Sequence, residues 1–554
     1  MSASSKKKLR KEQEIAALTE KQQHEQKEAK KLKVYSVTFV VAIALILAIG
    51  LGLLVNGWIN NSGILQRNSV ALTIGDHEIS AAELNYYYID SINAQYNNWY
   101  NSYGQYMSAY MGMMGLDIYS PLDQQMYNAE TSMTWADYFL ELAVNEAVSV
   151  YAVYDAAVAA GHQMTEDDTF SVEAAMQSMQ TAATNANYPT LEGYLKAFYG
   201  NGATEESFRN YLSVVALASS YETKEYNDLT YSDETIQKYS DEHYIDFTSF
   251  TYSTFQVNNT AFLEQVCTKA EGETDHKHSK EEEAAALKAA EEAANALLEA
   301  APITHIAFDK AIKNLDAYKD STTASATENI AQLYTSISNT DIADWLADNE
   351  RKPGDMTIIT NSTTSTNEDG TTTENPYAYT VVLFIERNDN NVKMVNIRHI
   401  LRAFSDDANA TEFTDAQKAA ALDAIETLQE DWLANGGTEE AFIARVSENT
   451  ADAGSVSNGG LYSDVYPGQM VPAFNNWCFA EGRKTGDYGI VESEYGYHLI
   501  YFVGEADTTF RGFMVENTLR NNDFDTWYTE ISESVEAKEL NTKYLSLDMV
   551  LSGN

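Results

Sequence analysis

Cysteine is nearly absent from this chain of 554 residues, which contains only Cys267 and Cys478. Two cysteines exclude a disulfide framework, although one disulfide between them stays open. An internal repeat described below places the two residues in different domains. Stability must therefore come from ordinary hydrophobic cores, which about 500 residues divided among three domains are able to supply.

Positive charge is also scarce. The chain has 36 Lys and Arg against 82 Asp and Glu, a net charge of -46, and residues 1–33 alone hold ten of the basic residues against five Glu. The rest of the chain therefore carries a charge of -51. A surface of this charge repels nucleic acid and other polyanions, so the composition argues against a nucleic-acid partner. It favours solubility, which suits a protein that must hold sticky partners without aggregating.

A long uncharged run follows the basic N-terminus. Residues 34–55 carry no charged side chain, and a helix of this length spans a bilayer core of about 30 Å at about 1.5 Å per residue. Because basic residues cluster before the run and not after it, the positive-inside rule predicts a cytoplasmic tail over 1–33, a single transmembrane anchor over 34–55 and an extracytoplasmic remainder. A cleaved signal peptide is the alternative, but the run is longer than a usual signal-peptide core and lacks a clear cleavage site after it.

The strongest functional signal lies near the C-terminus, where His399 and His498 bracket an ordered series of motifs. The series opens with NIRHILRAF, continues through a helical segment and SENTADAGSVSNGGLYS, and ends with GQMVPAF and ESEYGYHLIYFVGE. Strand alternation in the first motif places Ile397, His399 and Leu401 on one face. Residues 392–505 resemble a complete parvulin-type (PpiC, rotamase) peptidyl-prolyl cis-trans isomerase domain.

The resemblance implies roles for seven residues of this chain. The expected catalytic residues are His399, Asp452, Ser493 and His498, and the expected proline pocket is Leu461, Met470 and Phe474. Rotation about an X-Pro bond meets a barrier of about 18–20 kcal/mol but breaks no covalent bond. A catalyst therefore needs an apolar seat for the proline ring, little water, and polar groups that favour the twisted amide. The resemblance implies no cofactor and no metal.

Two positions depart from the family pattern. The family usually reads Gly-Gly-Asp-Leu-Gly at the turn, whereas this chain passes from Gly460 to Leu461 directly and has Tyr462 in place of the last glycine. The run Trp-Cys-Phe at 477–479 is also unusual. The alternative interpretation is that both histidines are buried core residues, but seven matched positions in order favour the parvulin domain.

The segment before this domain repeats it. ADWLADNERKPGDMTIITNS, which starts at Ala343, aligns with NNWCFAEGRKTGDYGIVESE, which starts at Asn475, and YAYTVVLFIE aligns with YGYHLIYFVG. Between the aligned pieces the first copy has a longer loop, rich in Ser, Thr and Asn, over residues 360–375. Residues 245–388 are therefore predicted to form a first parvulin-like domain.

This first copy is degenerate. Thr380 stands where His498 stands, the opening strand has no histidine, and neither the Gly-Gly-Leu turn nor the Gly-Gln-Met motif is present. His276 and His278 lie in a charged insertion of the copy, EGETDHKHSKEEE. A His-x-His pair is able to bind a metal, but no cysteine or second ligand pair is near it, so we expect a solvated loop and no metal.

Residues 68–244 resemble the helical chaperone module of SurA-like and PrsA-like foldases. Ser80 is predicted to cap the first long helix, with Glu83 completing a capping box, and 122–160 are predicted to form one helix. Residues 86–138 are crowded with Tyr, Met, Trp and Asn. Tyr and Met offer adaptable contact area, which suits weak binding of many unfolded segments. The same composition fits the core of the module or a dimer interface equally well.

The predicted fold is therefore α+β, with a single N-terminal transmembrane helix, the mainly helical module and two parvulin-like domains, the first degenerate. Residues 506–554 are predicted to form a C-terminal helix, which in related foldases returns to the N-terminal module.

The leading hypothesis is a membrane-anchored extracytoplasmic foldase of a Gram-positive bacterium, which isomerises X-Pro bonds and holds unfolded secreted clients. No cysteine closely follows residues 34–55, which excludes the lipoprotein anchor of many such foldases. The alternative is a non-catalytic chaperone or binding protein whose parvulin domains only grip clients. The second copy keeps every site position that the first has lost, which favours the enzyme. A homodimer stays open.

Overall fold

The computed structural model describes residues 62–548 except 118, 268–276, 368, 406, 408–409 and 411. The expected cytoplasmic tail, the expected transmembrane anchor at 34–55 and His276 lie outside the described residues. The chain divides into two compact units. The first runs up to Leu229 and resumes at Asn522, and the second runs from Thr230 to Asn521.

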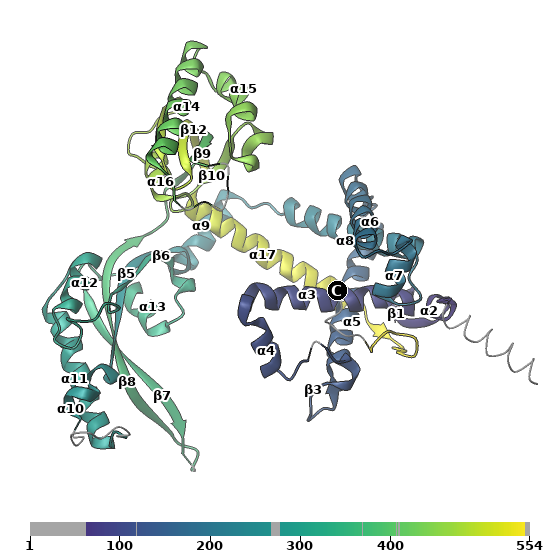
Figure 1. Cartoon of the computed structure of the whole chain (residues 1–554), viewed down its shortest axis with the longest axis horizontal. Coiled ribbons are helices and arrows are strands. Elements are labelled where there is room, and N and C mark those ends of the chain that lie inside the picture. Colours follow the sequence, from purple (N-terminus) through teal and green to yellow (C-terminus); the bar gives the residue numbers. More distant parts are fainter. Residues whose placement is uncertain are drawn as a thin grey trace, which may run out of the picture. The chain divides into compact units, whose positions relative to one another are not determined.

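The first unit is mainly helical (Figure 1). Its elements before Leu229 are α2 (Ile64–Asn68), β1 (Val70–Ile74), β2 (His77–Ser80), α3 (Ala81–Tyr103), η1 (Gly104–Tyr106), α4 (Met107–Met113), η2 (Leu122–Gln124), β3 (Met126–Asn128), β4 (Met133–Thr134), α5 (Trp135–Ala159), α6 (Glu166–Asn185), α7 (Leu191–Tyr199) and α8 (Glu205–Asp228).

Ser or Thr side chains set where the long helices of this unit begin. Thr134, Thr165 and Thr204 each form a reciprocal capping box at the start of α5, α6 and α8, which satisfies backbone N–H groups that the first turn leaves free. Ser80 also caps α3 and accepts the Glu83 N–H at 3.1 Å. The carboxylate of Glu83 accepts a hydrogen bond from Tyr151 instead, so the predicted box is half formed. The predicted helix over 122–160 was too long, because η2 and the β3–β4 hairpin occupy its first part.

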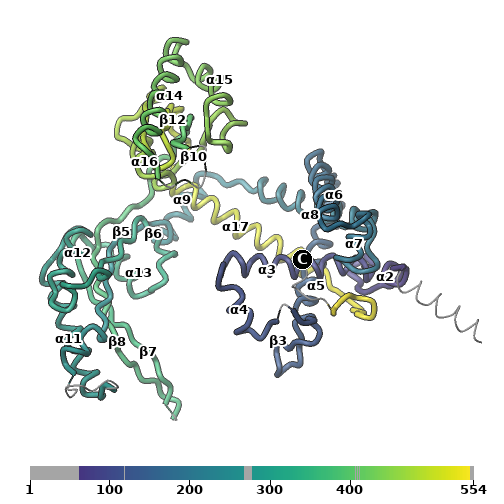
Figure 2. Tube along the Cα trace, in the orientation of Figure 1, coloured from purple at the N-terminus to yellow at the C-terminus, as the bar shows by residue number. Residues whose placement is uncertain are grey.

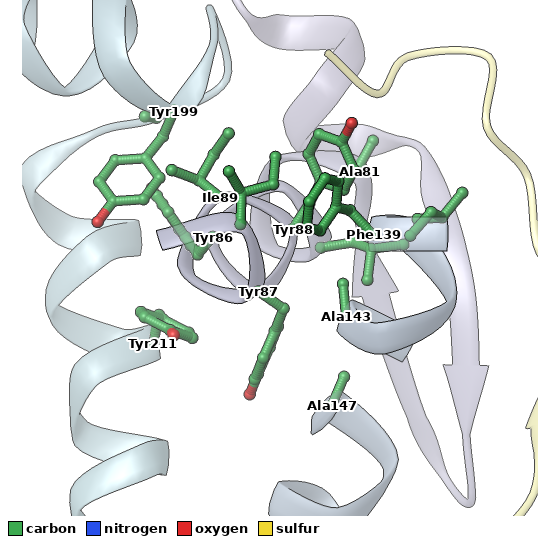
Figure 3. Packing of buried hydrophobic residues seen from close by; sticks show 14 of the residues in the cluster. Ala81, Tyr86, Tyr87, Tyr88, Ile89, Phe139, Ala143, Ala147, Tyr199 and Tyr211 are labelled. Atoms are coloured by element: carbon green, nitrogen blue, oxygen red, sulfur yellow. The ribbon is translucent and has the colours of Figure 1, made fainter. Parts of the chain in front are cut away.

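Three consecutive tyrosines of α3 form the centre of this unit. Tyr86, Tyr87 and Tyr88 are each 0% exposed. Figure 3 shows Tyr86 directed toward Tyr199 and Tyr211, with ring centroids 5.0 and 5.2 Å apart. Since successive residues of a helix point about 100° apart, α3 is buried on most of its circumference here. This part of the tyrosine-rich segment therefore belongs to the core.

Partly buried carboxylates lie beside these tyrosines. Asp90 accepts hydrogen bonds from Tyr199 at 3.2 Å and Tyr211 at 2.8 Å. Partial burial raises the pKa of Asp90 and of Glu83 above the usual range, because a low-dielectric interior disfavours the charged form.

The end of the chain completes the first unit. Helix α17 (Phe510–Glu533) passes from the second unit into the first, where Trp527 and Ile531 pack against the cluster formed by α5 and α8. Strand β13 (Ala537–Lys538) then pairs antiparallel with β1, with Ala537 opposite Ile74. Residues far apart in the sequence thus share one core.

The second unit contains a four-stranded antiparallel sheet of order β6-β5-β8-β7. Its elements are α9 (Asp233–Glu242), η3 (Tyr244–Phe247), β5 (Ser249–Asn258), η4 (Asn259–Phe262), α10 (Leu263–Val266), α11 (Lys280–Glu299), α12 (His305–Lys313), β6 (Thr327–Leu333), η5 (Tyr334–Ser336), α13 (Thr340–Ala347), β7 (Met356–Thr366) and β8 (Thr372–Asn388). We call this the first sheet.

Helices cover both faces of the first sheet. Helix α11 packs its alanines and Leu297 against Val257 and Val381 on one face, and α13 packs Ile342 against Phe250 on the other. The loop expected over 360–375 is a hairpin instead, since β7 and β8 stay paired out to Thr366 opposite Thr372. Figure 2 shows it as two long antiparallel arms.

The remaining part of the second unit contains a sheet of order β10-β9-β12-β11, which we call the second sheet. Its elements are β9 (Lys393–Ala403), α14 (Asp415–Ala434), α15 (Glu439–Asn449), η6 (Ala453–Asn458), β10 (Leu461–Val465), α16 (Pro472–Cys478), β11 (Tyr488–Glu492) and β12 (Gly496–Thr509). Trp432 and Phe442 of α14 and α15 pack on one face with Ile400, and Phe474 of α16 packs on the other with Ile397.

Within the described residues, α5 is the one helix with the length and apolar composition to cross a membrane. Trp135, Phe139 and Ala143 of this helix are almost fully buried in the first unit. Cys267 and Cys478 are both free thiols, so the disulfide left open by the sequence does not form.

Candidate active site

The register of two central strands brings the two histidines together. His399 on β9 pairs with Ile500, and His498 on β12 pairs with Leu401. Paired residues of antiparallel strands point to the same side, and so do residues two apart. His399, Leu401 and His498 therefore face one side of the sheet, where the two imidazoles stack with ring centroids 5.5 Å apart.

Hydrogen bonds connect the four expected catalytic residues in a line. Ser493 Oγ lies 2.7 Å from His498 Nε2, the Nδ1 atoms of His498 and His399 are 3.2 Å apart, and His399 Nε2 lies 2.9 Å from Asp452 Oδ2. An ionised carboxylate only accepts, so His399 donates from Nε2 and leaves Nδ1 as an acceptor. His498 then donates a hydrogen bond from Nδ1, and its Nε2 accepts a hydrogen bond from the Ser493 hydroxyl. One assignment of protons thus satisfies the whole line with both rings neutral.

Burial keeps both imidazoles neutral. His399 is 4% and His498 5% exposed. Burial lowers the pKa of His399, although the Asp452 carboxylate opposes the shift. Burial and the neighbouring His399 together lower the pKa of His498 to about 4. Neutral rings are available to hydrogen-bond across the physiological pH range.

Asp452 remains ionised because it collects donors. Burial alone would raise its pKa, but hydrogen bonds from Ser455, His399 and Tyr462 outweigh it, and the pKa of Asp452 is lowered. The Tyr462 hydroxyl donates to Oδ2 at 3.1 Å and the Gly454 N–H to Oδ1 at 3.2 Å. Burial and the Asp452 charge raise the pKa of Tyr462 to about 12, so the phenol remains a donor.

A cavity of about 330 Å³ opens beside this line of hydrogen bonds. Its lining residues are His399, Leu401, Asp452, Tyr462, Gln469, Met470, Val471, Phe474, Tyr495 and His498. The Phe474 ring, 3% exposed, stands edge-on to both imidazoles, at 5.6 Å from His399 and 5.2 Å from His498. The cavity therefore joins an apolar wall to one carboxylate and two neutral rings.

Leu461 is the expected pocket residue that lies elsewhere. It pairs with Arg398, whereas Tyr462 pairs with Ile397. Leu461 therefore faces away from the histidines and lines a second cavity with Arg398 and Asn396. Tyr462 lies on the histidine side, with its ring centroid 4.9 Å from that of His399.

The glycine turn holds β10 against β9 beside His399. The His399 N–H donates to the Gly460 carbonyl at 2.9 Å, and a Cβ on Gly460, at φ +74°, would lie 2.5 Å from the His399 carbonyl oxygen. Only glycine fits this close approach and this conformation. The turn thus fixes the strand that carries Tyr462.

Sequence reasoning missed the two hydroxyls that bind Asp452. Ser455 and Tyr462 both donate to Oδ2. Tyr462 had one signal in the sequence, since it replaces a family glycine, but a departure from a pattern does not say where a side chain points. Gln469 and Tyr495 also line the cavity, and the sequence did not predict their place there. Among the described residues no group of His, Cys, Asp and Glu is arranged to hold a metal ion.

Comparison with known proteins fits this geometry. Residues 379–505 match the family described as PPIC-type PPIASE domain. The chain is 34% identical over 113 residues to Foldase protein PrsA 1 of Listeria monocytogenes and of Listeria innocua, a match covering 20% of this chain and 31% of each relative. The chain thus spans about a third of the length of these curated relatives.

Two solved structures match parts of this chain, both with low TM-scores. The peptidylprolyl isomerase PrsA from Bacillus anthracis shares 19% identity over 26% of this chain and 59% of its own, with a TM-score of 0.17. A structure of SurA-like chaperones from Campylobacter jejuni shares 12% identity over 70% of this chain and 91% of its own, with a TM-score of 0.14. On the family match, the chain carries a parvulin-type PPIC PPIase domain over residues 379–505, and over 113 residues it is similar to PrsA foldases.

Proposed function

We propose that this protein isomerises X-Pro bonds in other polypeptides and holds them while they are unfolded. The observation that carries the proposal is the hydrogen-bonded line from Ser493 to Asp452 beside an apolar cavity. The reaction requires no nucleophile, because rotation about the amide breaks no covalent bond.

Each part of the site has a role in this reaction. Met470 and Phe474 seat the proline ring and exclude water. Excluding water strengthens the field of the Asp452 carboxylate at the twisting amide, whose charge distribution differs from that of the planar amide. The two neutral histidines position Asp452 and the wall of the cavity. The Asp452 carboxylate fixes their tautomers, and Ser493 completes the line of hydrogen bonds. His399, Asp452, Ser493 and His498 act as one unit, and Leu461 supports the strand from the other face.

The first sheet is proposed to be a silent copy. Thr380 donates to Asn361 Oδ1 at 2.8 Å, in the place where His498 and Ser493 meet in the second sheet. Residues 245–388 would then serve packing or client contact, while residues 392–505 perform the reaction and 68–244 with 506–554 hold clients.

The basic residues 1–33 and the uncharged run at 34–55 support a cell-membrane location with one span and the bulk of the chain outside. The clients would be unfolded or partly folded secreted proteins with X-Pro bonds. Neither a cofactor nor a nucleic acid is part of the proposal.

The decisive experiment is a protease-coupled proline-tetrapeptide assay on the purified chain, beside a variant with both His399→Ala and His498→Ala. We expect the chain to accelerate isomerisation and the double variant to lose most of that acceleration while the first unit still melts as before. A wild-type rate equal to the uncatalysed rate would favour the alternative, a chaperone whose parvulin domains only grip clients.

A further inference from the structure

Exposed aromatic and methionine side chains are concentrated in one short segment of the first unit. They lie on the end of α3, on η1 and α4, in the following loop and on β3 (Figure 1). We call this set the Tyr–Met surface: Tyr100, Tyr103, Tyr106, Met113, Tyr119, Met126 and Tyr127. Tyr106, Met113 and Tyr119 are 68%, 87% and 75% exposed. Exposed apolar groups gathered in this way mark interaction sites more often than isolated ones do.

A firm core lies beneath these side chains. Trp99, Met107 and Met111 from the same segments are buried, and so is Trp135 at the start of α5. The surface rings are themselves ordered, since Tyr103 stacks on Tyr110 at 3.8 Å. Tyr103 and Tyr127 each have one ring face covered by a neighbouring tyrosine, whereas Tyr106 and Tyr119 are largely open to solvent.

Charge on this surface is of one sign. The stretch from Asn68 to Leu195 contains many Asp and Glu but no Lys or Arg. Between Asp90 and Asp137 the only charged side chains are Asp117, Asp123 and Glu130. The exposed tyrosines thus have acidic neighbours along the chain and no basic ones.

Three basic residues of α7 and α8 are paired within the helical part of this unit. Lys196, Arg209 and Lys224 are each paired with a carboxylate of α6, α7 or α8. An aromatic face attracts a cation, and a field of one sign draws oppositely charged partners and repels like ones. A second copy of this acidic surface would be repelled, which argues against a dimer formed here.

We propose that the Tyr–Met surface binds extended polypeptide segments in which Lys or Arg alternates with apolar side chains. The cations lie over tyrosine faces and near the three acids, and the apolar side chains contact the methionines. This inference rests on the holding activity proposed above and names the class of segment that is held.

The test uses the full chain and three fluorescent peptides of equal length, without proline, that share one apolar pattern and carry Lys, Gln or Glu at every third position. We expect the Lys peptide to bind most tightly, the Glu peptide most weakly, and the preference to shrink as salt rises. The triple variant Tyr100→Ser, Tyr106→Ser, Met113→Ser should weaken Lys-peptide binding about tenfold, as expected for the loss of a few exposed contacts of this kind.

The matched control is Val158→Ser with Phe170→Ser, two exposed apolar residues of the same unit at 53% and 73% exposure, and it should bind like the wild type. Both variants should keep the wild-type kcat/KM on a proline tetrapeptide. The inference would be overturned if the three peptides bound with equal affinity or if the triple variant bound the Lys peptide like the wild type. It would also be overturned if the wild type formed a dimer that the triple variant, but not the control variant, dissociates. Failure of all three peptides to bind would remove the holding activity itself, leaving the isomerase proposal to its own assay.

Discussion

The two four-stranded sheets of the second unit share a framework and differ in their centres. Both have the same strand order, and both have helices packed on the two faces. The turn before β7 in the first sheet and before β11 in the second makes the same hydrogen bond in both sheets. The Gly354 N–H donates to the Phe384 carbonyl and the Gly486 N–H to the Phe502 carbonyl, each at 2.9 Å. The repeat in the sequence is therefore a repeat in structure at this turn.

Arginine and tryptophan stabilise that turn in both sheets. Arg351 lies over Trp345 at 4.1 Å, and Arg483 lies over Trp477 at 3.8 Å. Each arginine also donates from Nε to the carbonyl of its tryptophan, at 3.1 and 3.0 Å. None of these four residues lines the cavity, so the repeated turn supplies framework and not catalytic groups.

The centres differ where the second sheet has its histidines. In the second sheet His399 pairs with Ile500, two residues after His498. In the first sheet Thr254 pairs with Val382, two residues after Thr380, so Thr254 and Thr380 are the counterparts of the histidines. A small hydroxyl is buried at little cost, whereas two buried imidazoles require a complete set of partners. The sheet therefore keeps its fold with threonine in place of both histidines, whereas the two buried histidines depend on every one of their hydrogen-bond partners.

The largest effect should come from the apolar wall. Phe474→Ala and Met470→Ala should each lower kcat/KM by about 100-fold, the loss that misplacing a substrate by about 1 Å produces, and at least as much as Asp452→Ala. Phe474→Ala should also destabilise its domain by about 3–5 kcal/mol, because a buried ring leaves a cavity. The measurement is kcat/KM on a proline tetrapeptide beside a thermal melt.

The repeat supplies the control for that experiment. Ile342 occupies the position of Phe474 in the aligned first copy and is buried. Ile342→Ala should destabilise the first sheet and leave kcat/KM unchanged. If the pocket variants stay fully active in a folded domain, proline does not bind in this cavity.

A smaller effect should come from removing one donor to Asp452. Tyr462→Phe should lower kcat/KM about 3- to 10-fold, in the range of a single hydrogen bond. Because the hydrogen bond from Tyr462 helps to lower the pKa of Asp452, its loss raises that pKa, and the acid limb of the pH–rate profile should move to higher pH. Ser455→Ala should shift the limb in the same direction.

Tyr495→Phe is the matched control, since Tyr495 lines the same cavity but is 56% exposed. We expect its acid limb to coincide with that of the wild type. An unchanged limb in Tyr462→Phe would mean that the tyrosine only fills space.

The sequence predicted what depends on strand alternation and motif order. It placed Ile397, His399 and Leu401 on one face because period-two alternation is local, and it found the repeat because the residues of the turn are local too. It did not find that Tyr462 replaces Leu461 on the histidine side. That choice depends on the register between β10 and β9, with its irregularity after Tyr462, which tertiary pairing decides.

The same limit explains two errors in element boundaries. The residues 360–375 are rich in Ser, Thr and Asn, which favour loops, yet pairing with the partner arm keeps them extended. The helix expected from 122 begins at Trp135, because the Thr134 cap and the β3–β4 hairpin precede it. Amino-acid composition alone does not show whether a segment pairs with another strand.

A modest effect is expected from pH. The unfolded state protonates histidine near pH 6.5, whereas in the native second sheet the pKa of His399 is lowered and that of His498 is lowered to about 4. Between these values the unfolded state binds more protons, so stability falls as pH falls from about 6.5 toward 4. Hydrogen exchange should show β9 and β12 losing protection over this window while β5 and β8, with threonine at both positions, do not.

The helical unit should respond in the opposite direction. The raised pKa values of Glu83 and Asp90 mean that the native state binds more protons above pH 4.5, so its stability rises as pH falls toward that value. His498→Gln should flatten the slope of the second sheet alone. Parallel changes in all three regions would show that net charge, not these groups, governs the response.

The last pair of substitutions is expected to have no effect on isomerase activity. It tests whether two histidines are sufficient to form the site. In a chain already inactivated by His399→Ala and His498→Ala, we would introduce Thr254→His and Thr380→His into the first sheet. We expect no recovery of isomerase activity. The grafted rings would lack a carboxylate with the donors of Asp452, and Ile342 offers no aromatic wall where Phe474 stands. Asn361, the partner of Thr380, would hydrogen-bond one ring and leave the other without an orienting group. The measurement is kcat/KM beside hydrogen exchange of β5 and β8, which establishes that the sheet still folds. Recovery of even a tenth of the wild-type rate in a folded sheet would show that the first copy keeps a proline seat, and that only its histidines were lost.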